Sequence, residues 1–217
     1  METVRCLILN KTENELISCS DDSTINFYSL QFQKSDLLFK YSLKKHEQKV
    51  TSICLNQSET TLISCSEDGQ IIVWKKNEYD DWEFKNFVNH SFTQQGGKIV
   101  FIQDNQFIWT QHKEKIFLVF EEKDQIFKQK SNKSIIYENK QKVKFPFIYN
   151  SQFNLIICSY DKTIEVVKQQ SDGTFVILSS FQNQINGKQK GVVTNDSKYL
   201  LIWNSQLSNF NIFKLYS

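Results

Sequence analysis

The sequence predicts an all-β fold in which one unit of short strands recurs along the chain, and two observations lead to this prediction. The first is a repeated heptapeptide: residues 16–22 (LISCSDD) and 62–68 (LISCSED) differ at one position and lie 46 residues apart (62 − 16). A weaker copy, residues 155–161 (LIICSYD), lies 93 residues further on (155 − 62), close to two more periods. The second is that short β-rich runs alternate with polar turns. A strand repeat of about 40–45 residues is typical of a propeller.

The repeat that starts near residue 46 shows how one unit is built. Residues 50–55 and 61–66 are β-rich runs joined by a polar turn, and 71–74 (IIVW) lacks polar alternation, as a strand buried on both faces does. The turn before it contains Gly69, which tolerates a positive φ. Residues 82–88 alternate as a half-exposed strand does. Four antiparallel strands would make one blade.

This repeat resembles the WD40 family of G-protein β-like propellers. That family has a His before the first strand, a Ser or Thr in the second, an Asp in the tight turn and a Trp in the third strand. In this chain the four positions fall on His46, Ser64, Asp68 and Trp74. The resemblance implies that these side chains form a buried hydrogen-bonded tetrad, because a buried Asp or His needs a partner for each polar atom.

The other repeats keep less of the motif. Blade one has Ser18 and Asp22 but Tyr28 in place of Trp, and the third has Lys113 where Asp is expected. Cys19, Cys65 and Cys158 are expected to share one repeat position. A single WD40 propeller domain is predicted over residues 1–217. Its expected blades span residues 4–45, 46–92, 97–140, 143–185 and 188–217.

The strand count leaves the closure of the propeller open. Four blades are expected to be complete, whereas the fifth ends after its third strand. Either five blades close imperfectly, or the chain is an open, partial propeller belonging to a longer one with perhaps seven blades. An open array would have unpaired strand edges, which favour self-association.

Composition narrows the classes of partner. The chain has 26 basic and 24 acidic residues, a net charge of +2, and this balance argues against nucleic acid as a partner. No apolar run approaches the ~20 residues of a membrane span, and no signal peptide is apparent. The sequence has one Arg, no Ala, 20 Gln and 18 Asn, a bias typical of AT-rich genomes and of ciliates.

The five cysteines are odd in number and contain no C-x-x-C pair. Neither a disulfide framework nor a zinc site is therefore expected, and reduced thiols suggest a cytoplasmic protein. The chain has three histidines, and His46 belongs to the tetrad. The expected inner strands, residues 4–9, 50–55, 98–102, 143–148 and 191–194, carry no Asp or Glu. We therefore expect no catalytic residue, no metal and no cofactor.

What remains is a binding surface made of loops on rigid strands, with other proteins as partners. In the family the favoured face carries the turns between second and third strands and the loops before first strands. The candidate residues on this face are Asp21, Glu47, Lys49, Glu67, Phe92, Lys113 and Tyr160. Phe92 and Tyr160 are the candidate aromatic anchors. The alternative is that these loops simply vary.

Two further readings stay open. Residues 74–82 (WKKNEYDDW) resemble the charged loop of the propeller that targets cytosolic iron–sulfur proteins, so an iron–sulfur assembly adaptor is the first alternative. The second is a partial propeller that has only a structural role or no retained function.

Overall fold

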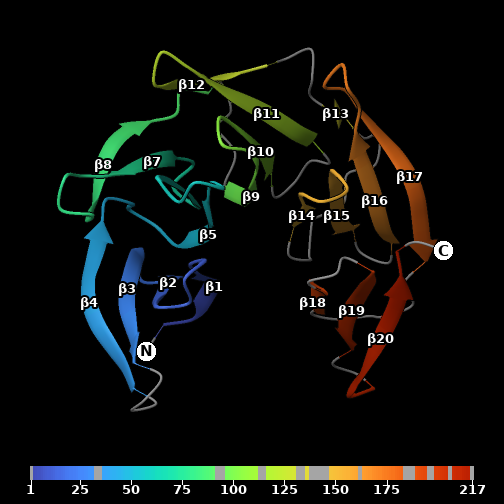
Figure 1. Ribbon diagram of the computed structural model, residues 1–217, viewed down its shortest axis with the longest axis horizontal. Helices are drawn as coiled ribbons and strands as arrows, with labels where there is room; N and C mark the ends of the chain where they lie inside the picture. The colour runs from blue at the N-terminus through green and yellow to red at the C-terminus, as the bar shows by residue number, and fades with distance from the viewer. Residues whose placement is uncertain are drawn as a thin grey trace. The chain divides into compact units, whose positions relative to one another are not determined.

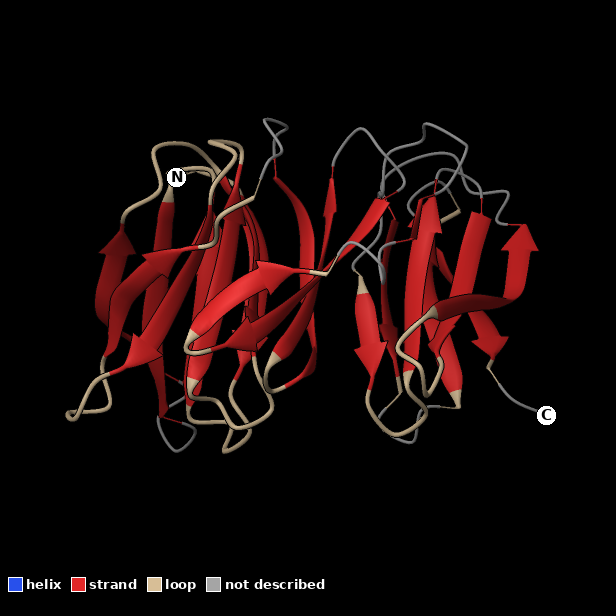
Figure 2. Cartoon of the chain, turned by 90° about the horizontal axis from the view of Figure 1, so that it is seen from above, coloured by secondary structure: helices blue, strands red, loops and turns tan. Residues whose placement is uncertain are grey.

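The computed structural model describes residues 2–31, 36–90, 96–111, 116–130, 135–136, 147–160, 163–182, 189–194, 198–204 and 207–215. Within these ranges the chain forms strands and turns and contains no helix (Figure 2). The all-β prediction is confirmed.

The strands form five antiparallel sheets, called blades 1 to 5 in chain order (Figure 1). Blade 1 contains β1 (Val4–Leu9), β2 (Glu15–Ser20), β3 (Thr24–Gln31) and β4 (Asp36–Lys44). Blade 2 contains β5 (Val50–Leu55), β6 (Thr61–Ser66), β7 (Ile71–Lys76) and β8 (Trp82–Phe87). Blade 3 contains β9 (Gly96–Gln103), β10 (Gln106–Gln111), β11 (Ile116–Lys123) and β12 (Ile126–Gln129), and β13 (Ile135–Ile136) also pairs with β11. Blade 4 contains β14 (Ile148–Asn150), β15 (Leu155–Tyr160), β16 (Thr163–Gln169) and β17 (Phe175–Gln182). Blade 5 contains β18 (Gln189–Val193), β19 (Tyr199–Asn204) and β20 (Asn209–Lys214).

The fifth blade has three strands in the described part of the chain, as the sequence predicted. Of the first strand expected over residues 143–148, positions 143–146 lie outside the described residues, and β14 begins at Ile148. The chain divides into two compact units: Met1–His112 with Val119–Lys130, and Lys113–Leu118 with Ser131–Ser217. The single domain expected over residues 1–217 stays a prediction.

Asparagine side chains shape the hairpins between the first two strands of blades 1 and 2. Asn56 Oδ1 accepts hydrogen bonds from the backbone N–H groups of Thr60 and Thr61, each at 2.9 Å. Asn10 Oδ1 accepts the corresponding pair in blade 1. These bonds hold the residue at positive φ in each hairpin, Glu59 and Glu13, and so close the turn at the same place in both repeats.

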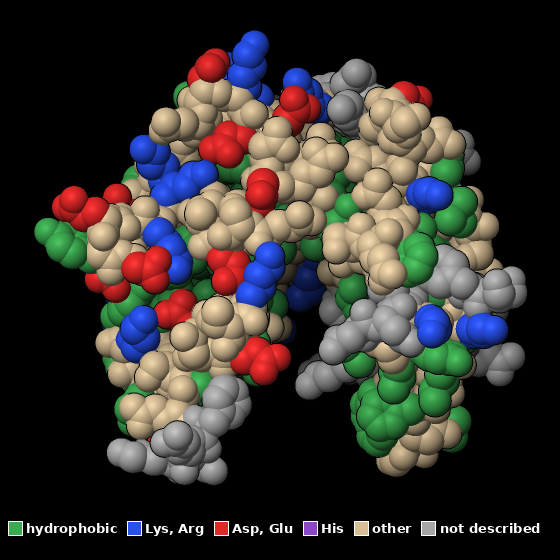
Figure 3. All heavy atoms as spheres, in the orientation of Figure 1, with side chains coloured by type: hydrophobic (Ala, Val, Ile, Leu, Met, Phe, Trp, Pro, Cys, Tyr) green, Lys and Arg blue, Asp and Glu red, His purple; other side chains and the backbone are tan. Residues whose placement is uncertain are grey.

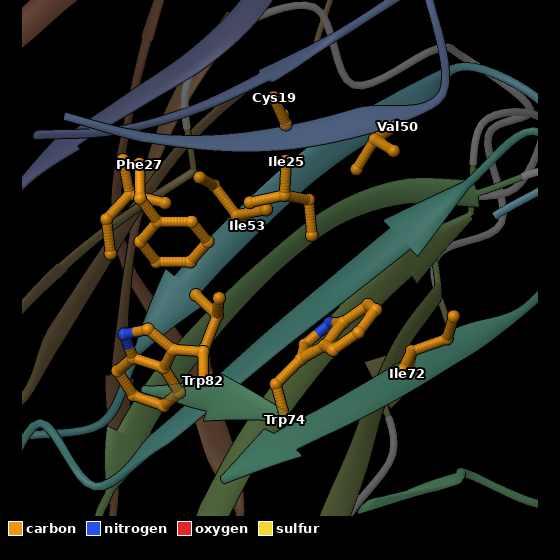
Figure 4. Packing of buried hydrophobic residues seen from close by; sticks show 10 residues of the cluster. Cys19, Ile25, Phe27, Val50, Ile53, Ile72, Trp74 and Trp82 are labelled. Carbon is orange, nitrogen blue, oxygen red and sulfur yellow. The ribbon is translucent and has the colours of Figure 1, made fainter. Parts of the chain in front are cut away.

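One buried hydrophobic cluster of the first unit lies between blades 1 and 2. Ile25 and Phe27 on β3 point towards Val50 and Ile53 on β5, and Trp74 and Trp82 complete the cluster (Figure 4). Phe27 stacks on Tyr41 with ring centroids 4.8 Å apart and on Trp82 at 6.5 Å. We call the side of a blade that packs on the preceding blade its front face, and the opposite side its back face.

The second unit packs blades 4 and 5 in the same way. Its core consists of buried side chains from β15, β16 and β19: Leu155, Ile157, Ile164, Val166, Leu200 and Ile202. The back face of blade 4 therefore covers the front face of blade 5, which Leu200 and Ile202 occupy.

The expectation that Cys158 shares the position of Cys65 is wrong by one residue. In blade 2 the backbone N–H of Asn56 donates to the carbonyl of Thr61 at the start of the second strand. In blade 4 Asn150 pairs with Leu155 at the corresponding place. Counting from these residues puts Cys158 in register with Ser64. Tyr160 pairs with Thr163 across the next turn, whereas Ser66 bonds Gln70 across the corresponding one, so the connection in blade 4 is one residue shorter.

Candidate functional site on the face of the β2–β3 and β6–β7 turns

The structure brings the four tetrad residues of blade 2 together in one hydrogen-bonded chain. Trp74 Nε1 lies 2.9 Å from Ser64 Oγ, and Ser64 Oγ lies 2.7 Å from His46 Nε2. His46 Nδ1 lies 2.9 Å from Asp68 Oδ2. His46, Ser64 and Trp74 are buried. These hydrogen bonds connect the loop before β5 to the strands β6 and β7 and to the turn between them.

The chemistry of the end groups sets the direction of the two outer hydrogen bonds of this tetrad. An indole N–H can only donate and a carboxylate can only accept. Trp74 therefore donates to Ser64, and His46 donates from Nδ1 to Asp68. When Nε2 carries no proton, it accepts from the Ser64 hydroxyl. The neutral imidazole with its proton on Nδ1 satisfies all of these contacts.

Asp68 also organises the turn itself. Its Oδ1 accepts from the backbone N–H of Gln70 at 2.8 Å, and its Oδ2 accepts from that of Glu47 at 3.0 Å. Gly69 takes a φ of 80°, a value that a residue with a side chain rarely adopts. Burial alone would raise the pKa of Asp68, but the hydrogen bonds from His46, Gln70 and Glu47 lower it below its ordinary value of 3.8.

This lowered pKa predicts a loss of stability in acid. A carboxyl whose pKa is lower in the folded state stabilises the fold above its unfolded value of 3.8, and that contribution is lost as the pH falls through the folded value. We expect the free energy of unfolding to decrease below about pH 4 and to decrease less in Asp68→Asn. Denaturant titrations between about pH 6 and pH 3 measure this difference. The control is Asp124→Asn at an exposed turn; equal acid sensitivity of Asp68→Asn and the unsubstituted protein would contradict the prediction.

Blades 1 and 3 lack parts of the hydrogen-bonded tetrad in different ways. In blade 1, Asp22 Oδ1 accepts from the backbone N–H of Thr24 at 3.0 Å and from its hydroxyl at 2.6 Å, so the turn remains closed without a histidine. In blade 3, His90 packs against Trp109, which is fully buried, with ring centroids 5.1 Å apart. Trp109 stands on the second strand, where blade 2 has Ser64.

On the surface beside these turns, Asp21 is the centre of an ion cluster that joins blades 1 and 2. The Arg5 guanidinium makes a bidentate ion pair with Asp21, in which Nε donates to Oδ1 at 2.5 Å and Nη2 donates to Oδ2 at 2.7 Å. Lys49 Nζ from the loop before β5 lies 3.8 Å from Asp21 Oδ2. The hydrogen bonds and charge of Arg5 hold the pKa of Asp21 below its ordinary value, and the contact with Asp21 raises the pKa of Arg5.

Sequence analysis placed Asp21 on the binding face, but in the structure the two cations that contact Asp21 are more exposed than Asp21 itself. The Asp21 side chain is 7% exposed, whereas those of Arg5 and Lys49 are 40% and 45% exposed. Asp21 thus orients two cations and offers little surface of its own. Sequence analysis missed Arg5 as a surface residue of this face, although it is the one arginine of the chain.

The remaining candidates have varied positions. Glu47 is exposed, and the backbone N–H of Glu67 donates to Lys49 O at 2.9 Å, which seats the two loops side by side. Tyr160 ends β15, and its side chain lies outside the described part. Phe92 and Lys113 lie outside the described residues.

The five cysteines are free thiols. Burial raises the pKa of Cys54 and of Cys65 to about 12. Among the described residues, no group of three or more His, Cys, Asp or Glu side chains is placed to hold a metal ion. No helix in the same residues is long and apolar enough to cross a membrane.

Comparison with known proteins bears on the class of the fold. The sequence model of the WD domain, G-beta repeat, matches residues 2–29 and 38–75. The chain is similar to the β-propeller domain of Cps50 (Swd1) from Myceliophteria thermophila, with a TM-score of 0.71 and 13% identity over 99% of this chain and 66% of that one. It is also similar to a putative 6-phosphogluconolactonase from Bacteroides uniformis, with a TM-score of 0.77 and 11% identity over 97% of this chain and 66% of that one. The comparison with curated proteins found no match.

The fold is therefore a β-propeller. The WD40 repeats matched by sequence lie in blades 1 and 2, where the resemblance was strongest. The chain spans 66% of the length of each of the two solved chains.

Proposed function

We propose that this protein is a non-catalytic scaffold that binds another protein through the face carrying the β2–β3 and β6–β7 turns. A WD40 propeller fold is typical of protein-interaction scaffolds. The observation that supports this face is the ion cluster of Arg5, Asp21 and Lys49, which fixes two partly exposed cations on two different blades.

A pre-ordered cation is suited to recognition because less side-chain entropy is lost when a partner binds. The bidentate grip on Asp21 orients Arg5, and the tetrad holds the loop that carries Glu47 and Lys49. The face is mixed in sign, with the exposed Glu47 beside the two cations. We therefore expect a polar interface in which charge decides the partner and the rate of association.

The test compares two substitutions with the same change of charge. Lys49→Glu reverses a cation on the face, and Lys85→Glu reverses an exposed cation on the outer strand β8. Each variant is expressed with a tag in place of the endogenous protein, purified, and its co-purifying proteins are quantified by mass spectrometry. We expect Lys49→Glu to lower the yield of a stoichiometric partner about tenfold, and Lys85→Glu to leave it unchanged.

Two outcomes of this co-purification experiment would contradict the proposal. If both variants retain the same partners in the same amounts, this face is not the binding site. If the unsubstituted protein is recovered without a stoichiometric partner, the reading as a partial propeller with no retained binding function replaces the proposal.

The iron–sulfur adaptor remains an alternative with no support from the geometry of its loop. Trp82, the last residue of the resembling segment, is buried against Phe27, and its backbone N–H donates to the hydroxyl of Tyr41 at 3.1 Å. Asp80 takes a φ of 64° and pairs with Lys76. These packing and turn roles account for the segment. The likeness to the putative lactonase is one of fold and adds no catalytic residue.

A further inference from the structure

Two cysteines of blade 1 lie directly opposite one another on neighbouring strands. Cys6 on β1 is the Cα partner of Cys19 on β2 in the antiparallel pairing of the two strands. Residues opposite one another in such a pair have Cα atoms about 4.5–5.5 Å apart and side chains on the same face. A disulfide joins residues whose Cα atoms are about 4.4–6.8 Å apart. The strand pairing therefore holds the two thiols within the range of a disulfide.

Both side chains lie on the back face of blade 1 and point towards blade 2. Cys19 is fully buried in the cluster between these blades (Figure 4). Cys6 packs against the same cluster and is less buried, with its Sγ 3.9 Å from the carbonyl oxygen of Ile53. All of these residues belong to the first compact unit, so the surroundings of the pair are set within that unit.

The equivalent positions of blade 2 carry a single thiol. There Ser52 is the Cα partner of Cys65, in the register that Cys6 and Cys19 have in blade 1. A serine hydroxyl cannot form a disulfide. Cys54, on the same strand as Ser52, is opposite an isoleucine. Blade 1 is therefore distinguished from blade 2 by a cysteine at both positions.

The two opposed thiols differ in reactivity. The hydrogen bond with Cys19 lowers the pKa of Cys6 below its ordinary value of 9.0, and the positive charge of Lys98 acts in the same direction. The same hydrogen bond, together with burial, raises the pKa of Cys19. Acidic and basic side chains are interspersed over blades 1 and 2 on the face that Figure 3 shows, so these nearby groups and not a broad field of one sign favour the Cys6 thiolate. A thiolate beside a second thiol is the arrangement found at redox-sensitive cysteines.

We propose that Cys6 and Cys19 are a reactive pair that hydrogen peroxide oxidises to a reversible disulfide. Peroxide suits this place because it is close in size to water and can reach a thiol packed between two sheets. The pair differs from the structural disulfide framework that the sequence argued against, and its oxidation requires no protein partner.

The reaction has two steps, and its atoms and electrons balance. The Cys6 thiolate attacks one peroxide oxygen, the O–O bond breaks, and hydroxide leaves with the electron pair and takes a proton from solvent, which leaves a sulfenic acid on Cys6. The Cys19 sulfur then attacks the Cys6 sulfur, the S–O bond breaks, and the departing hydroxide takes the Cys19 proton. The two cysteines lose two electrons, and peroxide is reduced to two molecules of water.

The first measurement uses the unsubstituted protein. The chain is reduced, freed of reductant and treated with about 100 μM hydrogen peroxide, and the remaining thiols are blocked with N-ethylmaleimide. Tryptic cleavage after Lys11 separates the two cysteines, so mass spectrometry without reduction detects the disulfide as a pair of joined peptides. We expect this pair to form at least about tenfold faster than the other three cysteines are oxidised, and dithiothreitol to reverse it.

Two variants assign the roles of the pair. Cys19→Ser removes the resolving thiol, so we expect a sulfenic acid to persist on Cys6 and to be trapped by dimedone. Cys6→Ser removes the reactive thiol, and Cys19 should then stay reduced. The matched control is Cys65→Ser, which removes a buried thiol at the equivalent position of blade 2 and should leave formation of the Cys6–Cys19 disulfide unchanged. Urea titrations check that each variant is folded.

The result for the unsubstituted protein decides the proposal even where a variant fails to fold. Cys6 and Cys19 that both remain reduced overturn it, and so does a disulfide that joins Cys6 to Cys54 or Cys65. Oxidation of all five cysteines at one rate also overturns it, because the strand pairing would then not select this pair.

Discussion

Replacing Trp74 with alanine is expected to lower the free energy of unfolding by about 3–5 kcal/mol, the usual cost of truncating a buried tryptophan. The side chain is 2% exposed in the core between blades 1 and 2. Its loss removes that packing and takes from Ser64 the donor that completes the hydrogen-bonded chain to His46 and Asp68. Urea titrations followed by circular dichroism measure the change.

Two further variants separate packing from hydrogen bonding. Trp74→Phe keeps most of the volume but removes the indole N–H, and we expect it to cost about 1–2 kcal/mol. Tyr79→Ala changes an exposed aromatic in the neighbouring turn and should be close to neutral. A Trp74→Ala variant as stable as Tyr79→Ala would show that the tetrad is not part of the cooperative core.

Gly97→Ala is expected to destabilise the first unit by about 3 kcal/mol or more, at the upper end of the cost of overpacking. A Cβ at Gly97 would lie 1.8 Å from the backbone oxygen of Thr110 and 2.6 Å from its carbonyl carbon, so β9 could not keep its place beside β10. The carbonyl of Gly97 also accepts from Thr51 Oγ1 at 3.1 Å, which joins blades 2 and 3. Thermal and urea unfolding of the purified variant test this.

A second glycine supplies the matched control. Gly173 lies in the turn between β16 and β17 with a φ of 83°, so Gly173→Ala introduces backbone strain worth about 1 kcal/mol. We expect the Gly97 variant to lose clearly more stability than the Gly173 variant. Equal losses would mean that the approach of Gly97 to Thr110 is not close enough to constrain the residue type.

Sequence reasoning performed well where the signal was local. The strands and turns of blade 2 follow from alternation and turn chemistry within a few residues, and the structure forms them over closely similar ranges. The spacing of His46, Ser64, Asp68 and Trp74 likewise pointed to a set of side chains that the structure joins by hydrogen bonds. A buried histidine and aspartate need partners, and the repeat offers them at fixed offsets.

Sequence reasoning failed where the similarity of residue types pointed to one alignment of the repeats and the strand register to another. Residues 155–161 resemble the heptapeptide of blade 2, yet strand pairing places Cys158 opposite Glu165, in register with Ser64 and not with Cys65. One residue fewer in the β15–β16 connection shifts the strand, and a shift of one residue exchanges the two faces of a strand.

By itself, then, the sequence determined the all-β class, the four-stranded repeat and the tetrad of blade 2, because period, turn residues and motif spacing are written along the chain. Only the tertiary structure decided which surface residues meet. Asp21 is covered by Arg5, from 16 positions away, and lies near Lys49 of the next blade. A side chain on a blade is buried or exposed according to whether another sheet packs against its face, and no local pattern records the presence of that neighbour.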